Sequence, residues 1–318
     1  EVIKGGKTFF WSGLYHNDLN SRDTLATELN VLADFQPRVP QEYANADIVM
    51  LGNLHPLVQS SVLDQIAVQP KLVVLDTMNF WMDCALPELL DVIKRVDVIT
   101  INDEEARQLS GEYSLVKAAA KIQMMGPKYV VIKKGEHGAL LFNKKDVFFA
   151  PALPLEEVFD PTGAGDTFAG GFAGFLTQSE NISFENMKNA IIQGSNLASF
   201  CVEKFGTERM VDLDKKEVVA KIASQAAMEC YGLVGMASKN KSTGIVELLQ
   251  GPNGSKGVQV DIAEETVSIE LFVIIQYGTK ISVVADNIID RVKYYVENQT
   301  GLKVSKIDIN VQGVRVQK

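Results

Sequence analysis

The chain has 318 residues, of which 46% are hydrophobic, so it is long enough to bury a large core and to form two domains more readily than one. Its formal net charge of -9 disfavours nonspecific binding to nucleic acid or to an anionic membrane surface. The longest apolar runs have the length of strands and no signal peptide opens the chain, which excludes a membrane-spanning protein and favours a cytoplasmic one. The few cysteines and histidines are scattered, so neither a disulfide framework nor a zinc site is predicted.

The first fifty residues carry the weakest structural signals. Residues 7 to 11 predict a strand, residues 18 to 23 a polar turn, and residues 25 to 34 either a strand or a helix. Gly6-Lys7-Thr8 imitates the end of a P-loop, but the required leading glycine would fall at Glu1 and no strand precedes it. A P-loop is therefore excluded.

From residue 48 the pattern becomes a regular alternation of strands and helices. Strands are predicted at 48–51, 72–75, 96–101 and 129–132, and helices at 61–68, 86–95, from 103 onward and at 115–125. This order predicts an α/β fold with a mostly parallel sheet and helices on both faces. Ligands of such sheets bind at the carboxyl ends of the strands.

Polar residues follow each of these predicted strands. The four tails are Gly52-Asn53, Asp76 to Asn79, Asn102 to Glu105, and Lys133 to Gly138. For Asn102 alone, a helix cap is the better interpretation. Four tails in series favour a ligand site at this edge of the sheet.

Residues 158 to 176 join a Pro-bounded loop to a small-residue helix, predicted from Thr167 to Leu176, through a glycine-rich turn. Gly163 and Gly165 are free to take backbone angles closed to other residues, so the amides of Gly163, Ala164 and Gly165 are expected to converge on an anion at the helix N-terminus. Asp166 beside them would repel a resting anion, and it suits a base that accepts a proton from a hydroxyl during phosphoryl transfer. The alternative is an ordinary turn with Asp166 as a helix cap.

The segment Asp160-Pro161-Thr162-Gly163-Ala164-Gly165-Asp166-Thr167-Phe168-Ala169-Gly170-Gly171-Phe172 resembles the C-terminal signature of the PfkB, or ribokinase-like, carbohydrate kinases. The resemblance implies that Gly163, Ala164 and Gly165 form an anion hole and that Asp166 is the catalytic base. It also implies ATP-dependent phosphoryl transfer to a hydroxyl of a small-molecule sugar or nucleoside.

Asn102 and Glu105 resemble the Asn-x-x-Glu motif of this family, which helps to organise magnesium and phosphate. The carboxylate of Glu105 would act largely through metal-bound water. ATP and magnesium are therefore the cofactors that the resemblance implies.

Two further segments resemble the nucleotide-binding parts of the family. Lys134 and Gly135, with Gly138, match a loop whose backbone lies close to the nucleotide, which would explain the glycines. Residues 184 to 205 predict a long helix pair, within which Asn196 matches a position that lines the adenine pocket. A polar residue in a tight helix contact is the alternative for Asn196.

The kinase resemblance covers residues 1 to 214, and a complete member of the family is expected to be longer at its N-terminus. The opening strand and the Gly-Gly-x-x-x-Asn segment, which hold the substrate in relatives, have no counterpart here. Since the chain also begins at Glu1, we expect it to be a fragment or a processed product with only part of the substrate lid.

The remainder of the chain predicts a small α+β module, with helices at 218–228 and 283–299, a hairpin of strands at 257–262 and 266–276, and a last strand region at 304–316. Residues 226 to 236, Gly257-Val258, Tyr277-Gly278, Thr300-Gly301-Leu302 and residues 311 to 314 resemble the alkaline-shock-protein, or YloU-like, family. This module has no catalytic motif, so protein interaction or a structural role is its expected function.

The predicted domains are therefore a kinase domain at 1–216 and an alkaline-shock-protein-like domain at 217–318, joined naturally or artificially. We expect the second domain to fold alone and to make few contacts with the first. The alternative function is a non-catalytic binding or structural protein. In that case the kinase half is silent, because its substrate segment is missing, and the C-terminal domain has a protein partner in envelope stress.

Overall fold

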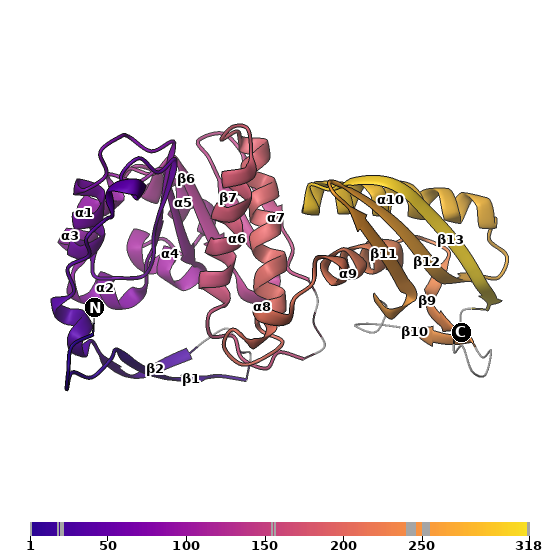
Figure 1. Ribbon diagram of the computed structural model, residues 1–318, viewed down its shortest axis with the longest axis horizontal. Coiled ribbons are helices and arrows are strands. Elements are labelled where there is room, and N and C mark those ends of the chain that lie inside the picture. The colour runs from indigo at the N-terminus through magenta and orange to yellow at the C-terminus, as the bar shows by residue number, and fades with distance from the viewer. Residues whose placement is uncertain are drawn as a thin grey trace. The chain divides into compact units, whose positions relative to one another are not determined.

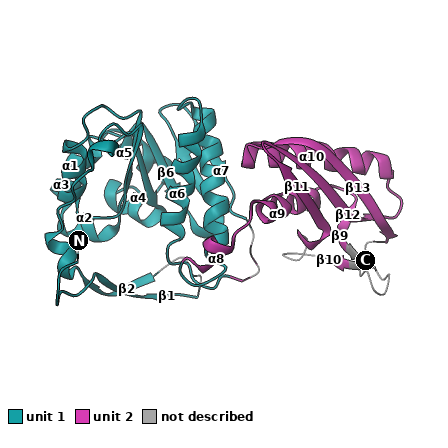
Figure 2. Cartoon of the chain, viewed as in Figure 1, with its two compact units in different colours: residues 1–154, 158–206 teal, residues 155–157, 207–318 magenta. Residues whose placement is uncertain are grey.

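The computed structural model of the protein describes residues 2–17, 19, 22–153, 155, 157–239, 246–249 and 255–316. The chain divides into two compact units, the first made of residues 1–154 and 158–206 and the second of residues 155–157 and 207–318 (Figure 2). The main segment of the second unit therefore begins about ten residues before the domain boundary predicted between residues 216 and 217. The predicted domain boundary itself stays a prediction. None of the helices in the described ranges is long and apolar enough to cross a membrane.

The first unit begins with a separate two-stranded antiparallel sheet and continues as an α/β alternation (Figure 1). Its strands are β1 (Phe10–Tyr15), β2 (Arg22–Glu28), β3 (Ile48–Leu51), β4 (Leu72–Asp76), β5 (Val98–Asn102), β6 (Tyr129–Lys133), β7 (Ala139–Phe142) and β8 (Val147–Ala150). Its α-helices are α1 (Pro56–Asp64), α2 (Asn79–Cys84), α3 (Leu86–Ile93), α4 (Asp103–Ser110), α5 (Leu115–Gln123), α6 (Ala164–Gln178) and α7 (Phe184–Cys201). Short 3-10 helices lie at Asn30–Asp34, Gln41–Tyr43 and Gly135–His137.

The main sheet of this unit has the order β3-β4-β5-β6-β7-β8. Strands β3 to β6 are parallel, and β7 and β8 extend the sheet in antiparallel pairs. Every residue of β4 is buried, as expected for a central parallel strand covered on both sides. The predicted mostly parallel sheet is confirmed, whereas β7 and β8 were not predicted.

Two hydrophobic cores flank this sheet because successive strand residues point to opposite faces. Val73 and Leu75 pack among residues of α1 to α5, and Leu72 and Val74 pack among residues of α6 and α7. Figure 1 shows α6 and α7 together on one side of the sheet. The predicted cover of helices on both faces is confirmed.

Several predicted element boundaries were wrong. The first strand occupies residues 10–15 instead of 7–11, and of the ambiguous region 25–34 the first residues end strand β2 (22–28) while 30–34 form a 3-10 helix. Helix α1 starts at Pro56, earlier than predicted, because proline suits the first turn and His55 Nδ1 accepts a hydrogen bond from the Leu57 amide.

The helix pair predicted at residues 184 to 205 is also wrong, because α7 is one helix that ends at Cys201. A left-handed glycine, Gly206, follows shortly after its end. The polar turn predicted at 18–23 lies partly outside the described residues.

The second unit is an α+β domain. Its helices are α8 (Glu208–Asp212), α9 (Lys215–Met228) and α10 (Ile281–Thr300), and its strands are β9 (Leu233–Lys239), β10 (Val246–Leu249), β11 (Val258–Ala263), β12 (Thr266–Gln276) and β13 (Lys303–Arg315). Strand β12 pairs with β11 and β9 antiparallel and with β13 parallel. The predicted hairpin, helices and last strand are confirmed.

The core of the second unit lies between this sheet and two helices. Val267, Ile269 and Leu271 alternate along β12 and are buried, and they pack with residues of α9 and α10. Along α10, Val284 and Ile288 fall at helical spacing and are buried in the same core. Both predicted patterns are therefore present: buried residues recur at every second position of the strand and once per turn of the helix.

Candidate active site at the carboxyl ends of the parallel strands

Three neighbouring parallel strands of the first unit end in polar residues at one edge of the sheet. Strands β4, β5 and β6 end at Asp76, Asn102 and Lys133. Asn102 and Lys133 are paired in register across β5 and β6. The sheet thus brings together side chains that are far apart in the sequence, at the edge where such sheets bind ligands.

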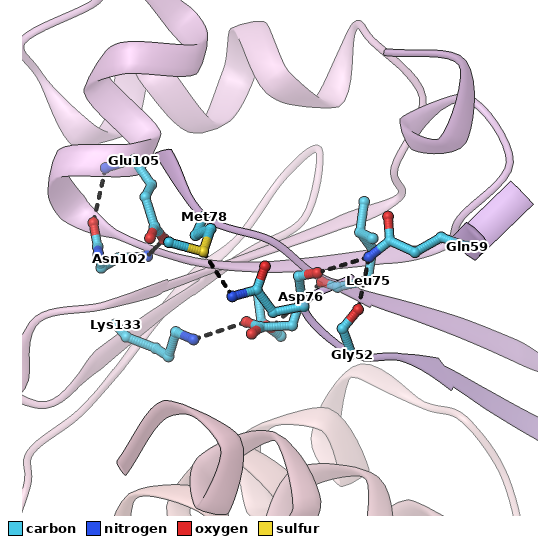
Figure 3. A network of polar contacts seen from close by, with 10 residues as sticks. Gly52, Gln59, Leu75, Asp76, Met78, Asn102, Glu105 and Lys133 are labelled. Carbon is cyan, nitrogen blue, oxygen red and sulfur yellow. Dashed lines mark hydrogen bonds and ion pairs between the residues drawn. The ribbon is translucent and has the colours of Figure 1, made fainter. Parts of the chain in front are cut away.

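Asp76 and Lys133 form a buried ion pair (Figure 3). The Nζ atom of Lys133 lies 2.9 Å from Oδ1 of Asp76, and the Thr100 hydroxyl donates to the same oxygen over 2.8 Å. The two charged side chains are 17% and 9% exposed. Charges this far from water are tolerated in proteins when they are paired and hydrogen-bonded, as they are here.

The ammonium group of Lys133 remains charged despite its burial. Burial lowers its pKa, but Asp76, followed by Glu105 and Asp166, raises it, and the net effect is a pKa above the usual value. A fixed positive charge therefore lies at this edge of the sheet.

Asn102 and Glu105 form a capping box at the start of α4 (Figure 3). Oδ1 of Asn102 accepts a hydrogen bond of 2.8 Å from the Glu105 amide, and Oε2 of Glu105 accepts one of 2.7 Å from the Asn102 amide. The alternative interpretation of Asn102 as a helix cap is thus correct. Burial raises the pKa of Glu105 to about 7, and Lys133 opposes this rise.

The glycine-rich turn leads directly into α6, three residues earlier than predicted. Gly163 caps the helix with a φ of 85°, a conformation that favours glycine, and α6 begins at Ala164 instead of Thr167. The Ala164 amide donates to the Pro161 carbonyl over 3.2 Å, and the Thr167 amide donates to the Gly163 carbonyl over 2.9 Å. Asp166 is consequently a residue of the first helical turn.

Gly165 has a different reason to be glycine from the one that the sequence suggested. It lies within α6, and a Cβ atom placed on it would be 3.2 Å from Nζ of Lys133. The expectation that Gly165 needs an unusual backbone angle is therefore wrong. Its missing side chain leaves room for the Lys133 ammonium beside the helix N-terminus.

The carboxyl group of Asp166 belongs electrostatically to the same cluster. The residue is exposed, but partial burial of its carboxyl group raises its pKa above the usual value, and Asp76 adds to this rise while Lys133 opposes it. A raised pKa makes a carboxylate a stronger base. The predicted base thus lies in an environment that suits the task.

The β1–β2 hairpin reaches this site from the N-terminal part of the chain. The Tyr15 hydroxyl lies 3.2 Å from Oγ1 of Thr162, in the turn before α6. Arg22, at the start of β2, is near enough to lower the pKa of both Glu105 and Asp166. Sequence reasoning did not single out Tyr15 or Arg22, because no local pattern links them to a turn so distant in the sequence.

The loop predicted to approach the nucleotide is a short 3-10 helix between β6 and β7. A Cβ atom on Gly138 would lie 2.0 Å from the Ala150 carbonyl oxygen, so the close packing of strand β8 is enough to require this glycine. The Lys134 amide donates to the Gly138 carbonyl over 2.8 Å and closes the loop. Nucleotide binding by Lys134, Gly135 and Gly138, and by the buried Asn196 of α7, stays a prediction.

No group of three His, Cys, Asp or Glu side chains in the described ranges is arranged to hold a metal ion by itself. A hollow of about 460 Å³ lies at the opposite edge of the sheet, lined in part by Lys71, Asp97, Lys128 and Glu180. Its charges have both signs, and none of the clustered carboxylates lies there. The strand-end cluster is therefore the better candidate for chemistry.

A mixed, mostly parallel sheet covered by helices, with a glycine-rich turn and an acidic residue at its carboxyl edge, places the first unit in the ribokinase-like fold class. A family model described as pfkB family carbohydrate kinase matches residues 13–213, and one described as Asp23 family, cell envelope-related function, matches residues 207–316. The chain belongs to the PfkB family of carbohydrate kinases over the first range and to the alkaline-shock-protein (Asp23) family over the second. Both predicted resemblances are confirmed.

Individual relatives agree with this assignment. The chain is 50% identical to the Bacillus subtilis protein YloU over 101 residues, which are 31% of this chain and 84% of YloU. It is 33% identical to a cytidine kinase of Thermococcus kodakarensis over 176 residues, which are 54% of this chain and 62% of that enzyme. The crystal structure of Thermotoga maritima ribokinase shares the fold, with a TM-score of 0.53 and 24% identity over 68% of this chain and 70% of that one.

Proposed function

We propose that the first unit is an ATP-dependent kinase domain that transfers a phosphoryl group to a hydroxyl of a sugar or nucleoside. The observation that best supports this proposal is the position of Asp166 in the first turn of α6, where Asp76 and Lys133 influence its pKa. Membership of the PfkB family and the similarity to a cytidine kinase support the substrate class.

Asp166 would be the base of this reaction. It would accept the proton of the substrate hydroxyl while the hydroxyl oxygen forms a bond to the γ-phosphorus of ATP and the bond from that phosphorus to the bridging oxygen breaks, which releases ADP. The amides of Gly163, Ala164 and Gly165, at the positive end of α6, would stabilise the charge on the transferred group. For Ala164 this requires its amide to turn from the Pro161 carbonyl or to share its hydrogen bond.

ATP and magnesium fit the remaining residues of the site. The loop of Lys134, Gly135 and Gly138, with Asn196, would contact the nucleotide. One carboxylate oxygen of Glu105 is engaged in the capping box and the other is an oxygen donor of the kind magnesium prefers, so Asn102 and Glu105 would hold the ion through water or phosphate. Magnesium, when bound, would neutralise phosphate charge.

The test is product formation from ATP across ribose, fructose, fructose phosphates, adenosine and cytidine. The proposal predicts a saturable, phosphorylated product with at least one of these substrates. ATP binding without any product would favour the alternative of a silent kinase half. Absence of ATP binding would contradict the nucleotide site itself.

A further inference from the structure

We infer that Lys133 binds the phosphoryl group that is transferred from ATP, and that Asp76 positions Lys133 for this contact. The inference rests on the proposed function and adds to it a cation that the kinase signature does not contain.

The position of the ammonium group is the first observation. Nζ of Lys133 lies so close to Gly165 that a Cβ atom there would be only 3.2 Å away. Gly165 is in the first turn of α6, where the leading amides of a helix lack intrahelical acceptors and favour an anion. The strand end and the helix N-terminus thus direct positive charge at the same place.

The hydrogen-bonding capacity of Lys133 is the second observation. An ammonium group has three N–H donors. Among the residues that the structure describes, the ammonium of Lys133 donates to Oδ1 of Asp76. The Thr100 hydroxyl donates to that same oxygen and so fixes the carboxylate. Asp76 therefore orients the ammonium, while further N–H bonds are left to donate to phosphate oxygens.

The charge balance of the site is the third observation. The carboxyl groups of Asp76, Glu105 and Asp166 all lie close enough to Lys133 to raise its pKa, and carboxylates near the site repel a polyphosphate. Lys133 opposes them from the end of the buried strand β6, whereas Arg22, a second cation that acts on Glu105 and Asp166, is exposed on the hairpin. Lys133 is thus the cation best placed to offset the acidic residues against the transferred group.

The test compares ATP with ADP, because only ATP carries the group that Lys133 would contact. Binding of each nucleotide in the presence of magnesium is measured by titration calorimetry on the full chain. The wild type is expected to bind ATP more tightly than ADP. Lys133→Met should weaken ATP binding by about 10- to 100-fold, the usual range for a charge-assisted hydrogen bond, and leave ADP binding unchanged.

The matched control is Lys128→Met, which removes the same charge next to the opposite end of β6 and should change neither affinity. If Lys133→Met left Asp76 buried without a partner and unfolded the domain, the double variant Lys133→Met/Asp76→Leu would keep the test valid. Apolar residues of similar volume commonly replace a buried ion pair without loss of stability. The double variant should fold and also lose the preference for ATP.

The role of Asp76 needs its own readout, and Asp76→Asn provides it. This variant keeps Lys133 and the size of the side chain, and its preference for ATP over ADP should fall by less than that of Lys133→Met. A preference for ATP that survives in both single variants would overturn the inference and leave the proposed function standing. A wild type that binds neither nucleotide would refute the proposed function, and the inference with it.

Discussion

The two units differ in the kind of residues that they bury. In the described ranges, the first unit buries two carboxylates, Asp76 and Glu105, at the carboxyl edge of its sheet. The second unit buries one charged residue, Arg209 of α8, which forms an ion pair with Glu217 of α9. Almost all its other buried residues are hydrophobic.

This difference shows that the first unit buries groups that lower its stability, whereas the second unit does so much less. A buried carboxylate with a raised pKa costs free energy of folding whenever it ionises. Its presence beside a fixed lysine is typical of a functional site. The hydrophobic core of the second unit serves stability, and a role in protein interaction or structure stays a prediction for it.

The largest expected effect concerns Asp166. Loss of a general base costs about 10²- to 10⁴-fold in rate, so Asp166→Asn should nearly abolish phosphoryl transfer while ATP binding is retained. A coupled assay for ADP production, with the substrate that the panel identifies, measures this effect. Asp91→Asn, which removes the same charge from the exposed surface of α3, is the control. Full turnover by Asp166→Asn would show that another group accepts the proton.

A smaller effect is expected from Glu105, whose pKa is about 7 in the folded protein against an ordinary value of 4.5. Because the folded state holds this proton more tightly, the resulting stabilisation is complete below pH 4.5 and is lost as the pH rises through 7. Between pH 5 and pH 8 the free energy of unfolding of the first unit should fall by about 2 to 3 kcal/mol through this group.

Denaturant unfolding followed by tryptophan fluorescence measures this fall, since Trp11 and Trp81 both lie in the first unit. Glu105→Gln keeps a side chain that is able to complete the capping box, and it should flatten the pH dependence. An equally steep fall in Glu105→Gln would mean that the group responsible lies elsewhere, for instance at Asp166, whose pKa is also raised.

The smallest effect is expected when the two units are separated. The second unit has a core of its own, so the fragment 207–318 should unfold in one cooperative thermal transition with a stability of several kcal/mol. Its removal should leave the melting temperature of the first unit nearly unchanged. A fragment that gains structure only when the first unit is added would show that the units share one core.

The sequence predicted those features that depend on residues close together in the chain. Strand and helix periodicity predicted the parallel sheet and the core of the second unit, because a buried face imposes its spacing directly on the sequence. The signature around Asp166 predicted the acidic residue of the site for a similar reason, since Gly163 marks a turn with a left-handed backbone. The roles assigned to it stay proposals.

Contacts between segments that are far apart in the chain could not be predicted from the sequence alone. The requirement for glycine at position 165 comes from Lys133, which belongs to another element, and the one at Gly138 comes from strand β8. The ion pair of Asp76 and Lys133 joins the ends of β4 and β6 across β5, and the alternation of strands and helices does not by itself give this strand order. Tyr15 contacts Thr162 and Arg22 acts on Glu105 and Asp166 from the N-terminal hairpin, and nothing in their own sequence neighbourhood indicates this.

Hydrogen exchange with and without ATP and magnesium tests most directly the claim that the nucleotide chemistry belongs to the strand-end site of the first unit. The amides of residues 133–138 and 163–166 should become protected from exchange when the nucleotide binds, and those of the α10 core in the second unit should not change. Protection confined to the second unit, or protection at the hollow around Lys71 and Lys128 instead, would contradict the site.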